Sequence, residues 1–313
     1  MMNRSPKNTQ DKVRVLGVGV ATMDVYVNQK RMYPGGNEYN IACHAVNCGG
    51  YGAFLGVFAN DRAGELLEDT LERIGVDSSM SHHEKGSSGY SLVELKEDGD
   101  RVFLYWNKEG VTDFHPIEFT DEELEYVKSF DVCCLGRCAS VSLEKIKFLS
   151  DNNIPLCYDF HATFDRTTID TLAPFVKYAF FSCSHLSEDE TKDYLRYAVE
   201  KGCDIAVGTR GAEKFFAYDG ERIYEQEPFK VKAIDALGAG DSFIAAFLVS
   251  YISMKKKNFG LRDTAEEKNS LEYIVSESLV AAARHAANVV KISGSVGIHY
   301  EIDPNKLGDV INL

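Results

Sequence analysis

The chain has 313 residues, of which 44% are hydrophobic and 26% charged, so it is long enough to bury one large core. Its formal net charge of −14 argues against nucleic acid and anionic membranes as main partners, because both bind through basic patches. The eight cysteines lie mostly in apolar runs, without a CxxC pair or a secretion signal, which predicts a cytoplasmic protein with reduced thiols and no structural zinc.

Strands and helices alternate along the chain after a polar start, residues 1–11, which we expect to be disordered. Residues 12–27 form one β-branched run, which predicts a strand buried on both faces of a parallel sheet. Two hairpins, at 90–106 and 213–226, interrupt the alternation. The other expected elements are helices at 37–52, 63–76, 188–202, 241–252 and 276–290, and strands at 53–60, 131–136, 154–160, 178–183, 204–209 and 229–235.

The turn Gly238-Ala239-Gly240-Asp241 stands between an expected strand and an apolar helix. Its small residues leave backbone N–H groups bare at a helix N-terminus, where they and the helix dipole attract an anion. A carboxylate beside bound phosphate is repelled by it, unless it takes a proton from a hydroxyl that attacks the phosphorus. The turn therefore indicates phosphoryl transfer to an alcohol; the alternative is a plain turn in which Asp241 caps the helix.

Two motifs carry a family resemblance. Residues 235–241 resemble the D-T-x-G-A-G-D signature of the ribokinase-like (PfkB) carbohydrate kinases, with Ala236 in place of the usual threonine. Residues 35–40 resemble that family's Gly-Gly pair followed by N-x-x-N on a helix. The resemblance implies an α/β fold, a three-layer α/β/α sandwich with a mostly parallel central sheet. It also implies a single domain over residues 12–300, with a small β-sheet lid whose strands come from about 22–34 and 86–110.

The resemblance assigns roles to individual residues, and alternatives remain open for some of them. Asn37 could instead cap its helix, Asn40 could lie on a solvated face, and much of the late helix could serve core packing. Three groups are implied: the base Asp241 with an anion hole from Gly238, Ala239 and Gly240; the sugar-binding residues Asp24, Gly35, Gly36, Asn37 and Asn40; and the ATP-binding residues Thr209, Gly211, Asn288 and Gly294.

The family resemblance also implies ATP, Mg²⁺ and a small-molecule sugar as ligands, with K⁺ as a candidate monovalent cation. The metal ligands stay unassigned, because Ser184 and Ser187 stand where the family has N-x-x-E. A homodimer through the lid is expected, with Tyr105 and Trp106 as candidates for lid packing or dimer contact.

The lid segment and the stretches at 33–40 and 159–165 look more like fructoselysine 6-kinases than ribokinases or adenosine kinases. This resemblance predicts transfer to the 6-hydroxyl of a fructosamine, with Glu109 as a candidate contact for its ammonium group. The alternatives within the fold are a fructokinase, a ribokinase or a nucleoside kinase. Two other classes compete: an NAD-dependent dehydrogenase, disfavoured because Thr22 stands where the third glycine of G-x-G-x-x-G belongs, and a non-catalytic sugar-binding protein.

Overall fold

The computed structural model describes residues 11–96, 101–107, 110–257 and 265–302. The expected acceptor contact Glu109 and all but one residue of the polar start, 1–11, lie outside these ranges.

A large central sheet forms the body of the molecule. In the described part of the chain it has nine strands, parallel except for the last two antiparallel pairs, β11 with β12 and β12 with β13. In sheet order the strands are β13 (Ile223–Gln226), β12 (Phe215–Tyr218), β11 (Ile205–Thr209), β10 (Tyr178–Ser182), β9 (Leu156–Asp159), β8 (Val132–Gly136), β1 (Arg14–Gly19), β4 (Tyr51–Ala59) and β5 (His82–Glu84).

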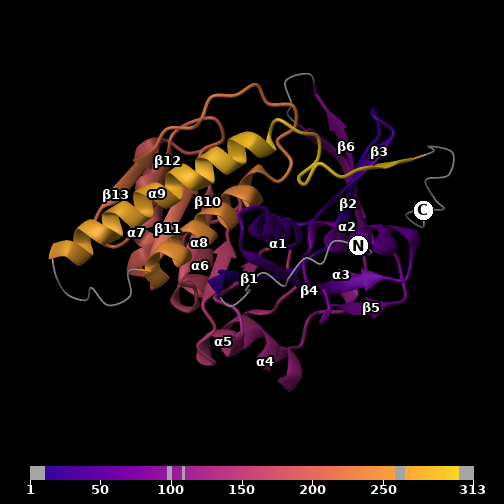
Figure 1. Ribbon diagram of the computed structural model, residues 1–313, viewed down its shortest axis with the longest axis horizontal. Coiled ribbons are helices and arrows are strands. Elements are labelled where there is room, and N and C mark those ends of the chain that lie inside the picture. Colours follow the sequence, from indigo (N-terminus) through magenta and orange to yellow (C-terminus); the bar gives the residue numbers. More distant parts are fainter. Residues whose placement is uncertain (1–10, 97–100, 108–109, 258–264, 303–313) are drawn as a thin grey trace, which may run out of the picture.

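Helices cover both faces of this sheet and complete three layers (Figure 1). On one face α1 (Asn37–Asn47), α2 (Arg62–Ile74), α8 (Ala239–Lys257) and α9 (Ala265–Val289) contribute apolar side chains to two core clusters. The opposite core receives side chains from α3 (Val111–Phe114), α4 (Asp121–Lys128), α5 (Leu143–Asp151), α6 (Arg166–Leu172), the 3-10 turn η2 (Ala173–Phe175) and α7 (Glu188–Glu200). The predicted sandwich with a mostly parallel sheet is confirmed.

A second, smaller sheet projects from the body beside β4 and α2 (Figure 1). Its strand order is β14 (Tyr300–Glu301), β3 (Arg31–Gly35), β2 (Thr22–Tyr26), β6 (Gly89–Leu95) and β7 (Arg101–Trp106). β2 runs parallel to β6, while β6 and β7 form the first predicted hairpin. We call this sheet the lid.

Two predicted strands are wrong in detail. The run 12–27 is divided between β1 of the large sheet and β2 of the lid, because the chain leaves the large sheet after Gly19 and crosses to the lid within two residues. No strand forms at 229–235. Pro228 lacks an N–H for a sheet ladder, and the segment instead carries Asp235 into the core.

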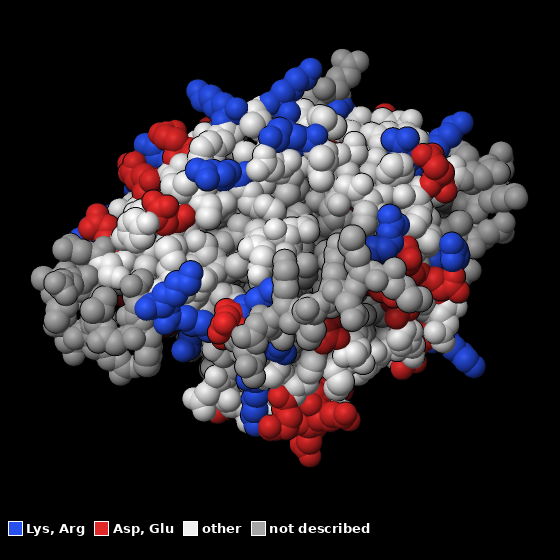
Figure 2. Space-filling model, in the orientation of Figure 1, with Lys and Arg blue, Asp and Glu red and all other residues white. Residues whose placement is uncertain are grey.

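The cysteines and surface charges follow ordinary patterns. All eight cysteines are free thiols and six of them are buried, as predicted for reduced core residues. On the face shown in Figure 2, basic and acidic side chains are interspersed, and acidic ones gather at the lower edge, where Figure 1 places α4. In the described part of the chain no helix is long and apolar enough to cross a membrane.

Candidate active site

The Gly-Ala-Gly turn opens the 19-residue helix α8 at the edge of the sheet where the parallel strands end. Gly238 has φ of +71°, a left-handed conformation that favours glycine, and a Cβ there would lie 1.9 Å from Ser295 Oγ. Open space surrounds the Cα of Gly240. The N–H of Ala239 donates to Ala236 O at 3.3 Å, whereas Gly238 and Gly240 have no backbone acceptor among the described residues. Two bare amides at the start of a long helix make a fitting cradle for phosphate oxygens.

Two asparagines hold Asp241 in the first turn of α8. Asn37 Nδ2 donates to Asp241 Oδ1 at 3.1 Å, and Asn40 Nδ2 donates to Oδ2 at 2.8 Å. Both asparagines come from the start of α1, whose N-cap is Gly36 rather than Asn37. Each carboxylate oxygen keeps a lone pair for a further proton, so the contacts aim Asp241 without saturating it. Asn37 and Asn40 thus contact the expected base itself.

Burial changes the acidity of Asp241. The residue is 6% exposed, and desolvation raises its pKa to about 6. The amide of Asn40 opposes this shift, the charge of Asp159 adds to it, and His161 and Asn37 oppose it. An acid with a pKa near 6 is largely ionised at neutral pH, yet more basic than an ordinary aspartate. These properties suit a general base for a hydroxyl.

Two further acids, Glu38 and Asp159, lie close to Asp241. Glu38 is 1% exposed; burial raises its pKa to about 8, and the charges of Asp241 and Asp159 act in the same direction. Burial also raises the pKa of Asp159, while the neighbouring His161 lowers it. We call Glu38, Asp159 and His161 the acid cluster. A cation bound at this edge of the sheet would stabilise the ionised forms of both acids and lower their pKa values.

Several buried polar atoms of this region lack partners among the described residues, including Glu38 Oε1, Asn40 Oδ1 and His161 Nε2. A Cβ built on Gly136, the last residue of β8, would lie 2.6 Å from Glu38 Oε1 and 3.3 Å from His161 Nε2. The two atoms therefore face the same point. Native proteins rarely leave buried polar groups unpaired, so these neighbouring unsatisfied atoms indicate a site where a polar ligand binds.

The lid supplies the opposite wall. Asp24 on β2 is buried, and a Cβ on Gly35 would lie 2.5 Å from its Oδ2, so the glycine makes room for this carboxylate. Gly36 has φ of +112°, and a Cβ there would lie 2.1 Å from Val20 O. The Gly-Gly pair thus lets α1 begin directly beneath the lid, which brings Asn37 and Asn40 toward Asp241.

Asp235 is fully buried and ties three segments together. It accepts hydrogen bonds from Tyr26 Oη on β2 at 2.8 Å, from Leu237 N at 2.9 Å and from Gly294 N at 2.8 Å. The first contact comes from the lid, the second from the residue before the Gly-Ala-Gly turn and the third from the segment after α9. We call these three hydrogen bonds the Asp235 clasp.

The residues expected to bind ATP occupy different surroundings. Thr209 ends β11, and Gly211 follows with φ of +63° and open space around its Cα. Asn288 is exposed near the end of α9, beside a groove of about 510 Å³ between α8 and α9. Gly294 packs against Tyr33, whose ring a Cβ would meet at 2.2 Å, and belongs to the Asp235 clasp.

Ser295 closes the turn from behind. Its Oγ lies 3.0 Å from His44 Nε2, and His44 Nδ1 lies 3.2 Å from His285 Nε2. Burial lowers the pKa of His44 to about 3 and also lowers that of His285, so both rings are neutral near pH 7. Gly238 therefore packs against a hydrogen-bonded chain of Ser295, His44 and His285 that carries no charge, so this chain adds no charge behind the bare amides.

Comparison with known proteins decides the family. The profile described as pfkB family carbohydrate kinase matches residues 10–295. The chain belongs to this family. It is accordingly a phosphotransferase with an alcohol group as acceptor, a carbohydrate kinase.

Individual pfkB relatives agree. The chain is 31% identical over 254 residues to fructosamine kinase FrlD of Bacillus subtilis (strain 168), covering 81% of this chain and 89% of that protein. It is 29% identical over 235 residues to fructoselysine 6-kinase of Escherichia coli (strain K12), covering 75% and 87%. Its fold matches fructokinase with bound ATP from Xylella fastidiosa, with a TM-score of 0.71, 16% identity and coverage of 92% and 94%.

Sequence reasoning missed Glu38, Asp159, His161 and Asp235. Glu38 and Asp235 lie inside the two quoted motifs, but the motifs alone assign them no role. Asp159 directly ends a buried strand, and the carboxyl ends of parallel strands are where α/β proteins bind ligands.

The metal ligands remain unassigned: in the ranges that the structure describes, no cluster of three or more His, Cys, Asp or Glu side chains could hold a metal. Ser187 caps α7 in a capping box with Glu190.

Proposed function

We propose that this pfkB kinase transfers the γ-phosphoryl group of ATP to the 6-hydroxyl of a fructosamine such as fructoselysine or fructose-asparagine. The observation that carries the proposal is the placement of Asp241, held by two asparagine amides and immediately following the bare amides of the Gly238–Gly240 turn. One group can accept the proton of an attacking hydroxyl while the other stabilises charge on the migrating phosphoryl group.

The chain's own residues account for most of the work. Asp241 accepts the proton of the primary hydroxyl, and Asn37 and Asn40 hold its carboxylate in place. The amides of Gly238 and Gly240 and the positive end of the α8 dipole stabilise the phosphoryl oxygens. Asp24 and the lid cover the acceptor and keep water from competing for the phosphoryl group. Mg²⁺, when bound with ATP, neutralises phosphate charge.

Two observations support a fructosamine over plain fructose. The curated relatives at 31% and 29% identity are named a fructosamine kinase and a fructoselysine 6-kinase. An ammonium group beside Glu38 and Asp159 would also favour the ionised forms of these buried acids, and a fructosamine carries a secondary ammonium group whereas fructose does not. A fructokinase is the second candidate, because a fructokinase with bound ATP shares the fold.

We also propose that the protein works as a cytoplasmic homodimer joined through the lid. The six buried, unpaired cysteines agree with a reducing compartment. The outer lid strand β7 exposes a run of large apolar side chains, which a second copy of the chain could cover.

An activity screen tests the proposed function. ATP consumption should be fastest with fructoselysine or fructose-asparagine and slower with fructose, ribose and nucleosides. Asp241→Asn should lower kcat with the preferred acceptor by about 10²–10⁴-fold while its binding, measured by calorimetry, persists. Asp193→Asn, an exposed acid on α7, is the matched control and should keep full activity. Activity in the Asp241 variant would contradict the assigned base, and a preference for nucleosides would contradict the acceptor.

A further inference from the structure

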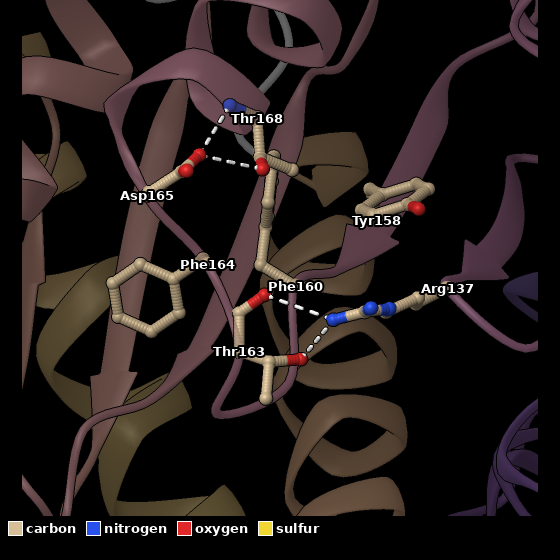
Figure 3. Close-up of a pocket in the computed structure, with 7 residues that line it drawn as sticks. All are labelled: Arg137, Tyr158, Phe160, Thr163, Phe164, Asp165 and Thr168. Atoms are coloured by element: carbon tan, nitrogen blue, oxygen red, sulfur yellow. Dashed lines mark hydrogen bonds between the residues drawn. The ribbon is translucent and has the colours of Figure 1, made fainter.

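A cavity of about 490 Å³ opens near the ends of β8 and β9 (Figure 3). Among its lining residues are Arg137, Tyr158, Phe160, Phe164 and Asp165. Figure 3 shows the guanidinium of Arg137 directed toward Thr163, with the Tyr158 ring on the same side of the cavity and the Phe164 ring across from it. We call this cavity the arm pocket.

Arg137 is fixed at the wall of the arm pocket. It follows Gly136 directly, and its Nη1 donates to Thr163 O at 3.2 Å and to Thr163 Oγ1. Among the residues that the structure describes, it has no carboxylate partner. A guanidinium offers five N–H donors, so its remaining edge is available for a planar anion.

The arm pocket adjoins the acid cluster. Tyr158 and Phe160 line the pocket from one face of the β9 strand end, and Asp159 between them points to the other face, toward Asp241 and Glu38, so the pocket and the acid cluster lie on either side of this strand end. The hydroxyl of Tyr158 is near enough to both the acid cluster and Arg137 for its pKa to depend on them. Burial is the main cause that raises this pKa to about 12; the charges of Glu38 and Asp159 also raise it, and Arg137 lowers it. A ligand that spans this strand end can therefore contact the acids with one part and Arg137 with another.

The lining matches one kind of molecule. Arg137 offers a cation for a carboxylate, Asp165 offers an anion for an ammonium group, and the aromatic rings offer apolar surface for an aliphatic stem. Asp165 is fixed by accepting hydrogen bonds from Thr168 N and Oγ1, both at 2.7 Å. An opposite pair of charges beside apolar rings suits the zwitterionic end of an amino acid with an aliphatic side chain.

We infer that the arm pocket holds the amino-acid end of the fructosamine acceptor, with Arg137 binding its α-carboxylate. The inference rests on the proposed function, because only a fructosamine carries such an arm. In a protein of net charge −14, with acids already at the sugar site, a substrate carboxylate is repelled unless a local cation receives it. Arg137 is that cation, and it makes the pocket a determinant of acceptor specificity.

The test varies the acceptor and the residue together. Wild-type kcat/KM should be about 10- to 100-fold higher for fructoselysine than for its α-carboxamide, the range of a charge-assisted hydrogen-bonded pair. Arg137→Met should remove most of this preference, and Arg137→Lys should restore part of it. Arg166→Met is the control: Arg166 stacks on Tyr197 at 4.2 Å outside the pocket lining, and its loss should leave the preference intact.

The outcomes separate the inference from the proposed function. If the wild-type enzyme has the same kcat/KM for fructoselysine and its α-carboxamide, the inference about Arg137 is wrong, while the proposed function still stands. The Arg137→Met variant is first shown to be folded by its thermal melt. If it then lowers kcat/KM equally for both acceptors, or raises KM for ATP instead, the inference is also overturned. If fructose is phosphorylated and no fructosamine is, the proposed acceptor itself is wrong.

Discussion

At the scale of single residues, the site depends on how far burial shifts acidity. Asp241 needs to be ionised to accept a proton, and its raised pKa of about 6 places that requirement near neutral pH. The amides of Asn37 and Asn40 limit the shift by stabilising the ionised form. If Asp241 is the base, as proposed, the two asparagines set the pH range in which it works.

A pH profile checks this relation. We expect kcat/KM for the acceptor to fall about tenfold per pH unit below pH ~6, since the protonated base is inactive. Asn40→Leu removes a hydrogen bond to the ionised carboxylate, so it should move the acidic limb to higher pH. Profiles normalised to their own maxima make the shift visible even if binding weakens. An unchanged limb in this variant would argue that another group controls the profile.

Glu38 should affect stability in the opposite sense to most carboxylates. Its folded pKa of about 8 exceeds the ordinary value of 4.5, so the folded state binds its proton more tightly than the unfolded state does. Stability contributed by this group is present at low pH and is lost as pH rises from 4.5 to about 8. Glu38→Gln should therefore stabilise the ligand-free protein increasingly across this window, by on the order of 2–4 kcal/mol at its upper end.

Thermal melts across this pH range measure the effect. Glu144→Gln, an exposed acid in the first turn of α5, is the control and should parallel the wild type. A Glu38→Gln curve that also parallels the wild type would show that Glu38 is ionised in the folded protein.

At the scale of elements, the Asp235 clasp joins the lid strand β2, the start of the Gly-Ala-Gly turn and the segment after α9. Asp235→Asn replaces one acceptor oxygen by an NH₂ group that faces donors, so it should lower the free energy of unfolding by about 1–3 kcal/mol. It should also reduce kcat, because the turn that carries Gly238 loses its anchor. Tyr26→Phe removes only one of the three hydrogen bonds and should cost about 1 kcal/mol. Equal effects of both variants on chemical denaturation would contradict the clasp.

The elements themselves were largely predictable, because hydrophobic period and glycine signals are local. The amphipathic pattern predicted a helix at 63–76, and α2 forms at Arg62–Ile74, ending at Gly75 in a left-handed conformation. The predicted strand at 229–235 failed for a reason outside the segment: Asp235 is drawn into the core by partners 59 and 209 residues away. Propensity along the chain cannot register such contacts.

The same distinction holds for the site. Asp241, Asn37 and Asn40 were predicted through motifs, and the structure brings them into contact. The acid cluster and Arg137 were not, because they come together only where β8 and β9 end side by side. Strand order, which no single motif encodes, decides which strand ends share an edge.

At the scale of the whole molecule, the lid leaves an apolar edge exposed. On β7, Phe103 is 57% exposed, and Leu104, Tyr105 and Trp106 are 50–52% exposed. β7 also ends the lid sheet, so both its side chains and one row of its backbone groups face outward. Such an edge favours association with a second copy of the chain.

The oligomeric state tests this proposal. Light scattering after size exclusion should give a dimer for the wild type, and Leu104→Lys should shift it toward the monomer. Phe148→Lys, which charges a partly exposed site on α5, should remain dimeric. A wild type that is monomeric at micromolar concentration would contradict a dimer through the lid.

The Asp235 clasp also constrains how this enzyme can be re-engineered. A natural route to a new acceptor would be to transplant the lid of another sugar kinase. Tyr26 belongs to the lid, while the carboxylate that accepts its hydrogen bond belongs to Asp235, just before the Gly-Ala-Gly turn. A chimera that exchanges the lid but keeps Asp235 would leave this buried carboxylate without the hydrogen bond from the Tyr26 hydroxyl. Successful lid grafts should therefore keep residues 26 and 235 as a hydrogen-bonding pair.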